Sequence, residues 1–343
     1  MGLKQLKTLG AGLALGLVAL APAQARASDS NDLQAAFDST FGTQERDPQT
    51  FEALYENGFE QRIAQLANGS DGRIGVYAMD LSTGQEIGIL ADQRFPMAST
   101  SKVAIAATYL AGVDNGRWSL TSEFRLPRRG GGYVPAHTLL DLMISKSCND
   151  CTDALLSAVG GPSAVNAWMR NAGIGGFQLN RDIATLIRDD GKLDPASRVD
   201  SRDSATPRAM GQLLAGIHQG RWLSASSRRV LLNAMAETTT GKNRMRSALP
   251  MHANLAHKTG TLSRTASDIG IFYTPDGRAI AAAIYVTGQS PSLAVENGSR
   301  SEKLSARRQR DQRIASITGA LYNGFAANRG NGRVYADAAY GGE

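Results

Sequence analysis

Residues 95–102 read Phe-Pro-Met-Ala-Ser-Thr-Ser-Lys and run without a break into an apolar segment, residues 103–113, with helical periodicity. Ser99 and Lys102 are three residues apart, so they share one face if a helix begins here. A serine beside an amine can act as a nucleophile with its base, provided that the lysine loses its proton easily. The first turn of a helix also presents free backbone N–H groups, which stabilise a developing anion. Taken alone, the same spacing is more often a capping serine followed by a surface lysine.

Strand patterns lie on both sides of this stretch, towards the two ends of the chain. Alternating apolar residues predict strands at residues 73–79, 85–90, 253–258, 267–273 and 280–286. Three-to-four-residue periodicity predicts helices, most of them in the middle of the chain, at residues 50–66, 103–113, 138–146, 152–159, 164–172, 207–218, 228–235 and 313–325. This order predicts an α/β fold in which both ends of the chain share one sheet and the helical middle forms a second lobe. A functional site is expected in the cleft between the lobes.

The composition is that of a globular protein and excludes several classes of function. Of the 343 residues, 42% are hydrophobic and 20% are charged. Two cysteines are too few for a disulfide-rich scaffold. The formal net charge of +6 falls to +3 once Lys4, Lys7 and Arg26 are removed with the N-terminal segment described next. A nearly neutral chain gives no support for a nucleic-acid partner.

The N-terminal residues have the pattern of a signal peptide. Lys4 and Lys7 precede an apolar run, residues 9–21, and Ala25-Arg26-Ala27 has the small-x-small pattern that signal peptidase cleaves. Residues 1–27 are therefore expected to direct export to the periplasm or medium, with no membrane span after cleavage. An uncleaved N-terminal anchor is the alternative, but the apolar run is short for it. Residues 28–49 are a polar leader, and residues 326–343 are expected to form a flexible tail.

Two further motifs follow the Ser99–Lys102 pair along the chain. Ser147-Cys148-Asn149 lies at a helix boundary, and residues 258–261, Lys-Thr-Gly-Thr, lie on a predicted strand. The motifs S-x-x-K, S-D-N and K-T-G together are the signature of class A β-lactamases and penicillin-binding proteins. The chain resembles class A β-lactamases from about residue 50 to residue 325. The resemblance includes residues 95–102 almost residue for residue, residues 202–207, residues 240–250 and the last strands.

The resemblance implies a fold and its boundaries. The fold is the two-lobe β-lactamase-like α/β fold, an antiparallel sheet flanked by helices together with an all-helical lobe. Residues 50–97 and 243–325 would form the α/β lobe, and residues 98–242 the helical lobe.

The resemblance also implies the roles of the acylation residues. Ser99 is similar to the acylated serine and Lys102 to its neighbouring amine. Ser147 resembles the serine that passes a proton to the leaving nitrogen. The backbone N–H groups of Ser99 and Thr261 would form the oxyanion hole.

A second group of residues is similar to the substrate-binding residues of the family. Asn149 resembles the asparagine that contacts the substrate amide. Lys258 and Thr259 resemble the pair that holds the substrate carboxylate by charge and hydrogen bond. Gly260 leaves room for the substrate at the cleft edge, and Thr261 completes the motif.

One departure from the family pattern concerns the carboxylate that activates the deacylating water. The family carries a glutamate there, in its Ω-loop, but this chain has no glutamate between residues 160 and 236. If Leu179-Asn180-Arg181 is matched to the family's L-D-R, the glutamate position falls on Ile183, and extra residues precede Arg202. If the residues are counted back from Asp203 without a gap, the base would be Asp190, whose reach is shorter by one methylene. Both placements remain open at this point.

Cys148 and Cys151 form a C-x-x-C pair, with Cys148 at the aspartate position of S-D-N. They could be two buried thiols or one local disulfide formed after export, and no thioredoxin-like pattern surrounds them. The four histidines have no metal-ligand spacing, so we expect neither a metal ion nor a cofactor.

The sequence therefore predicts an exported serine hydrolase of the class A β-lactamase type, monomeric, acting through an acyl-enzyme on Ser99 and contributing to antibiotic resistance. One alternative is a D-alanyl-D-alanine peptidase, which acts on a peptidoglycan peptide with the same acylation residues. The other is a β-lactam-binding protein without turnover. A carboxylate of the 179–203 loop near the Ser99 hydroxyl would favour hydrolysis, whereas Ile183 at that place would favour a slow or inactive enzyme.

Overall fold

The computed structural model describes residues 43–45, 58–68, 71–327 and 335–337. The predicted signal peptide, residues 1–27, lies outside the described residues, as does most of the leader and of the tail. No described helix combines the length and apolar character needed to cross a bilayer.

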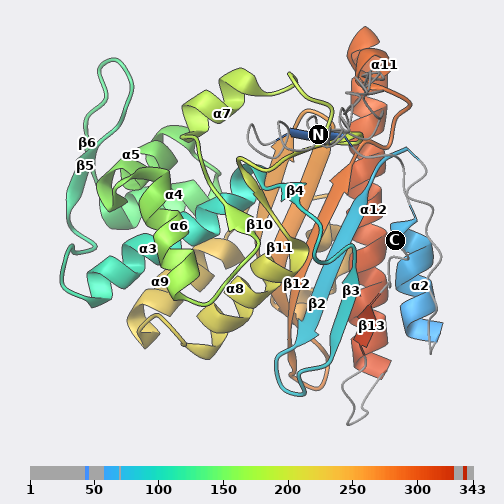
Figure 1. The fold of residues 1–343 in the computed structure, drawn as a ribbon. Helices are drawn as coiled ribbons and strands as arrows, with labels where there is room; N and C mark the ends of the chain where they lie inside the picture. The colour runs from blue at the N-terminus through green and yellow to red at the C-terminus, as the bar shows by residue number, and fades with distance from the viewer. Residues whose placement is uncertain (1–42, 46–57, 69–70, 328–334, 338–343) are drawn as a thin grey trace, which may run out of the picture.

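Six strands form the main sheet (Figure 1), in the order β10 (Ala256–Leu262), β11 (Thr265–Tyr273), β12 (Ala279–Thr287), β2 (Ile74–Asp80), β3 (Glu86–Ile89) and β13 (Tyr335–Asp337). Neighbouring strands are antiparallel, except that β13 runs parallel to β3. Val76 of β2 lies opposite Ile284 of β12. The two ends of the chain therefore share one sheet, as the sequence predicts.

Three small sheets complete the strands. The first contains β4 (Phe95–Pro96), β9 (Ser204–Ala205) and β7 (Phe177–Gln178). The second contains β5 (Glu123–Arg125) and β6 (Tyr133–Pro135), and the third contains β1 (Thr43–Glu45) and β8 (Arg198–Asp200). In the chain, strand β4 of the first of these sheets comes directly before the helical lobe.

Helices cover both faces of the main sheet (Figure 1). One face carries α2 (Gly58–Ala67), α10 (Met245–Ala248), the 3₁₀ turn η2 (Met251–Ala253), α11 (Leu293–Gly298) and α12 (Arg300–Ala327). The other face carries α8 (Pro207–Gln219), and beyond it lies the helical lobe with α3 (Ser101–Asp114), α4 (Ala136–Ser145), α5 (Asn149–Val159), α6 (Gly161–Asn171), α7 (Ile183–Asp189) and α9 (Ala225–Ala236).

Strand β12 shows how the core is divided. Successive side chains of a strand point to opposite faces. Ala281, Ala283 and Tyr285 belong to the hydrophobic cluster that includes the helical lobe. Ile280 and Ile284 belong to the cluster under α2 and α12. Because both faces of β12 are covered, its sequence is apolar throughout and lacks a polar alternation.

The predicted strands and helices are present in the described residues, with a few differences. Residues 50–57 of the predicted helix 50–66 lie outside the described residues, and the strand predicted at 253–258 begins at Ala256. Helix α8 lies against β2 and β12, so this part of the predicted helical lobe is also a layer of the sheet domain. The charged residues before residue 313 form the mostly exposed first turns of α12, which begins at Arg300. Helix α7 was not predicted, since seven residues are too few to show a period.

Candidate active site

Ser99 lies in a 3₁₀ turn, η1 (Ala98–Thr100), between strand β4 and helix α3. Ala98 has a φ of 48°, in the left-handed region that residues with a side chain seldom adopt. The turn packs against β10, where a Cβ on Gly260 would lie 2.7 Å from the Met97 carbonyl oxygen and 3.1 Å from the Ala98 Cβ. Glycine at this position therefore lets β10 approach the nucleophile turn closely.

Lys102 lies in the first turn of α3, which is buried from Ser101 to Ala111. Its amine donates to the Ser147 carbonyl at 2.8 Å, to the Ser147 hydroxyl at 3.2 Å and to Asn149 Oδ1 at 2.8 Å. The structure thus brings Ser147 and Asn149 to Lys102, although the sequence separates them by more than forty residues. In the described part of the chain, the Ser99 hydroxyl itself makes no hydrogen bond.

Lys258 lies on β10 and approaches Ser147 from the sheet. Its amine donates to the Ser147 hydroxyl at 3.0 Å and to the Thr259 carbonyl at 3.0 Å. The Ser147 hydroxyl therefore contacts both buried amines, Lys102 and Lys258. Ser147 has a φ of 58°, so its backbone is held in an unfavourable conformation that points its oxygens at both lysines.

Burial governs the protonation of both amines. Neither lysine side chain is exposed to solvent. Burial, together with the charge of Lys258, lowers the pKa of Lys102 to about 6, while Asp153 opposes the shift. Burial also lowers the pKa of Lys258 to about 7, against the raising effect of Asp268. At neutral pH the Lys102 amine is therefore largely free to accept a proton.

Cys148 and Cys151 form a disulfide, which decides between the two alternatives that the sequence leaves open. The bridge lies at the start of α5, and the Sγ of Cys148 accepts a hydrogen bond from the Cys151 N–H. Cys148 stands between Ser147 and Asn149, which contact Lys102. The bridge therefore fixes the turn that carries both polar residues.

Sequence reasoning missed Arg244, which lies beside the Lys-Thr-Gly-Thr strand. This largely buried guanidinium donates to the Gly260 carbonyl at 2.8 Å and to the Thr261 hydroxyl at 2.8 Å. It pairs with Asp311 of α12 at 2.6 Å. The Thr240 hydroxyl contacts the Thr259 hydroxyl at 2.5 Å. Arg244 and Thr240 both belong to the segment 240–250, whose resemblance was noted without assigning a role.

The 179–203 loop places Ile183, and not Asp190, next to the helical lobe. The backbone N–H of Ile183 donates to Asp153 Oδ1 of α5 at 2.7 Å. Ile183 is buried, with 2% of its surface exposed. Asp153 in turn lies close enough to Lys102 for its charge to affect the pKa of that amine. The first placement of the loop therefore fits the structure.

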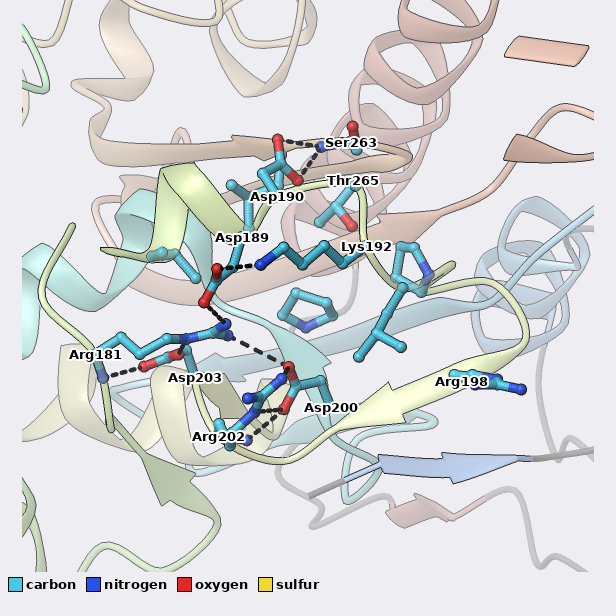
Figure 2. A pocket seen from close by; sticks show the side chains of 16 residues that line it. Arg181, Asp189, Asp190, Lys192, Arg198, Asp200, Arg202, Asp203, Ser263 and Thr265 are labelled. Carbon is cyan, nitrogen blue, oxygen red and sulfur yellow. Dashed lines mark hydrogen bonds and ion pairs between the residues drawn. The ribbon is translucent and has the colours of Figure 1, made fainter. Parts of the chain in front are cut away.

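Asp190 lies elsewhere, as Figure 2 shows. Both of its carboxylate oxygens accept the backbone N–H of Ser263, at 2.9 and 3.0 Å, in the turn after β10. The charges that act on it come from Lys303 and Arg307 of α12. No contact of the described residues joins Asp190 to Ser99 or Lys102, so the structure favours the placement that puts Ile183 at the glutamate position. This placement requires extra residues in the loop, which form part of α7 and the segment after it.

A cavity of about 160 Å³ lies under this loop. Figure 2 shows Arg181 on its wall, between Asp203 at 2.5 Å and Asp200 at 3.3 Å. Asp189 pairs with the same guanidinium at 3.2 Å. These ion pairs join the beginning of the 179–203 loop to its middle and its end. Ser99 is not among the residues that line the cavity, so it is distinct from the cleft of the two lysines.

Comparisons with known proteins agree with this geometry. Residues 58–325 match the Beta-lactamase enzyme family. A β-lactamase from Chitinophaga pinensis superimposes with a TM-score of 0.68 at 28% identity, over 79% of this chain and 100% of that one. An ancestral class A β-lactamase superimposes with a TM-score of 0.67 at 30% identity, over 78% of this chain and 100% of that one. The chain is therefore a serine hydrolase and belongs to the β-lactamase enzyme family.

Proposed function

We propose that this β-lactam hydrolase acts through an acyl-enzyme on Ser99 and that release of the acyl group limits its turnover. The observation that supports this most is the Ser147 hydroxyl, held between the amines of Lys102 and Lys258 at 3.2 and 3.0 Å. This arrangement lies directly beside the turn that carries Ser99. It provides a base, a proton relay and a cation in one dry cleft.

The positions of Ser99, Lys102 and Ser147 suggest the following steps for acylation. The neutral Lys102 amine takes the proton of the Ser99 hydroxyl while the serine oxygen bonds to the lactam carbonyl carbon. The backbone N–H groups of Ser99 and Thr261 stabilise the resulting oxyanion. The C–N bond then breaks, and the leaving nitrogen takes the proton of the Ser147 hydroxyl, which Lys102 restores. Asn149 holds the substrate amide beside Lys102.

The substrate carboxylate would bind at the other side of Ser147. The Lys258 ammonium supplies charge, and the Thr259 hydroxyl supplies a hydrogen bond. Gly260 keeps the strand free of a side chain here. Arg244 adds a second buried cation behind Thr261, at 2.8 Å from its hydroxyl, and so favours an anionic substrate.

Deacylation is the slow step because the 179–203 loop supplies no carboxylate where the family has its glutamate, since Ile183 occupies that place. An isoleucine side chain neither accepts a proton from water nor orients one. A base that is less well placed slows release, and complete loss of a general base costs about 10²–10⁴ in rate. The same observation favours a second candidate, a β-lactam-binding protein that forms the acyl-enzyme without turnover.

Intact-protein mass spectrometry with a penicillin tests the proposal. One ligand mass should appear on the peptide that contains Ser99, and Ser99→Ala should abolish it. Rapid mixing with a chromogenic cephalosporin should give a burst of one equivalent followed by slow steady turnover. An adduct that forms on Ser99→Ala would disprove the assignment of the nucleophile.

The same experiment separates the alternatives. A stable adduct without steady turnover indicates the binding protein. Release of D-alanine from a D-alanyl-D-alanine peptide, faster than any lactam hydrolysis, indicates the peptidase. We also propose export through residues 1–27 and a monomeric enzyme in the periplasm or medium. N-terminal sequencing of the secreted protein should begin at Ser28, and its sedimentation should give one chain mass.

A further inference from the structure

A carboxylate that the sequence motifs do not identify lies between the 179–203 loop and the catalytic amine. Asp153 is on α5, four residues after Asn149, so the two side chains share one face of the helix. Side chains at this spacing have Cβ atoms about 5–6 Å apart. Asn149 Oδ1 accepts from the Lys102 amine at 2.8 Å. Asp153 is therefore one helical turn from the contact that anchors the catalytic amine.

The backbone of the 179–203 loop also converges on Asp153. Its two carboxylate oxygens accept the N–H groups of Ile183 at 2.7 Å and Ala184 at 3.0 Å. Ile183 is the residue at the family's glutamate position. Asp153 thus approaches the same place from the helix that the family's glutamate approaches from the loop. Each carboxylate oxygen can accept two hydrogen bonds, so each retains one acceptor site for water.

We propose that Asp153 is the general base that activates water for deacylation in this chain. The proposal rests on the proposed acyl-enzyme at Ser99. A water between Asp153 and the acyl group gives its proton to the carboxylate, and its oxygen bonds to the acyl carbonyl carbon. The tetrahedral intermediate then releases the Ser99 oxygen, and the proton returns from Asp153 by way of Lys102 to that oxygen. One ester and one water become one carboxylic acid and the free serine.

The surroundings of Asp153 suit this task. Desolvation raises the pKa of the half-buried carboxyl, and the neighbouring Asp182 raises it further, while the two backbone N–H groups and Lys102 lower it. The net shift is upward, which makes Asp153 a stronger base than an ordinary aspartate. It is also the only carboxylate of the described residues whose charge contributes to the pKa of Lys102.

The chain provides a matched control in Asp190. Asp190 is also an aspartate of raised pKa whose two oxygens accept a backbone N–H group and hold the same loop, although its side chain is more exposed than that of Asp153. It has no contact with the lysines. Asp153→Asn and Asp190→Asn make the same chemical change to two loop contacts, and only the first removes a carboxylate near Lys102.

Mass spectrometry after a pulse of penicillin measures acylation and acyl release separately in the full-length protein. Asp153→Asn should slow acyl release by about a hundredfold or more, the effect expected for loss of a general base, while acylation changes little. Asp190→Asn should leave both rates near those of the wild type. In the double variant Asp153→Asn/Ile183→Glu, release should recover, because a glutamate on the loop supplies the missing base.

Other outcomes would overturn the proposal. Release from Asp153→Asn at the wild-type rate excludes this base, and so does a wild type that never releases its acyl group. Absence of any adduct on wild-type Ser99 would instead disprove the proposed function itself. If Asp153→Asn does not fold, Asp153→Glu and the pH profile of wild-type release decide. Release should decline as the pH falls through a carboxylate pKa above the usual range, and a flat profile would contradict the role.

Discussion

The buried amines of Lys102 and Lys258 both contact the Ser147 hydroxyl, and the proposed reaction needs one of them neutral and the other charged. Lys102 must be neutral to accept the proton of Ser99, whereas Lys258 must be charged to attract the substrate carboxylate. Burial lowers both pKa values, to about 6 for Lys102 and about 7 for Lys258. The functional form of the pair therefore exists in a restricted range of pH.

We therefore expect the second-order rate constant of acylation to have a bell-shaped dependence on pH. The rate should fall about tenfold per pH unit below about 6, where Lys102 becomes protonated, and should decline above about 7, where Lys258 loses its charge. Stopped-flow acylation across pH 4.5–9 measures the profile. A profile that rises up to pH 9 would show that the pKa of Lys102 is not lowered to this extent and that Lys258 keeps its charge.

The carboxylate role of Lys258 is tested with a neutral substrate. Lys258→Ala should weaken acylation by a lactam that carries a carboxylate by about 2 kcal/mol, or some thirtyfold, the scale of a hydrogen bond between charged groups. A methyl ester of the same lactam should lose much less, and its profile should lack the alkaline limb. Equal losses for both substrates would remove the carboxylate role from Lys258.

At the scale of elements, the start of α5 depends on the Cys148–Cys151 bridge. The bridge closes a short loop of chain, so the entropy model gives it about 2 kcal/mol of stability. Cys148→Ala/Cys151→Ala should lower the free energy of unfolding in urea by about this amount. Acylation should change only a few-fold, because the hydrogen bonds from Lys102 and Lys258 also hold Ser147.

A reductant provides the matching control for the bridge. Treatment of the wild type with a dithiol should reproduce the stability loss of the double variant and have no effect on that variant. A large loss of acylation in both cases would show that the bridge, and not the lysine contacts, sets the position of Ser147.

The motif residues could be predicted because each motif is local and lies at an element boundary. The helix after Ser99 and the strand around Lys258 are visible as apolar patterns. The positions of Arg244 and Asp153 could not be predicted in this way, because their partners are distant in sequence. The N–H of Ile183 meets Asp153 only once α7 has packed on α5. The sequence could not decide between Asp190 and Ile183 for the same reason, since spacing alone does not show how an enlarged loop folds.

At the scale of the whole molecule, the site lies where the two lobes meet along η1 and β10. The nucleophile turn begins the helical lobe, and Lys258 belongs to the sheet. Gly260 lies at this contact, with the Met97 carbonyl oxygen 2.7 Å from a Cβ built there. Any change in the packing of β10 on its neighbours therefore changes the distance between nucleophile and substrate site.

The pairing of β2 with β12 has a consequence for the route by which the protein reaches its native state. Ile74 lies opposite Val286, so more than two hundred residues must be available before the central pair of strands can form. Sheets that depend on such distant contacts assemble slowly. A partly synthesised chain can pair β2 with β3 but not with β12, so the sheet stays incomplete until the C-terminal strands emerge. Under the proposed export through residues 1–27, that delay would leave the polypeptide extended enough to pass through a translocation channel before it folds on the other side.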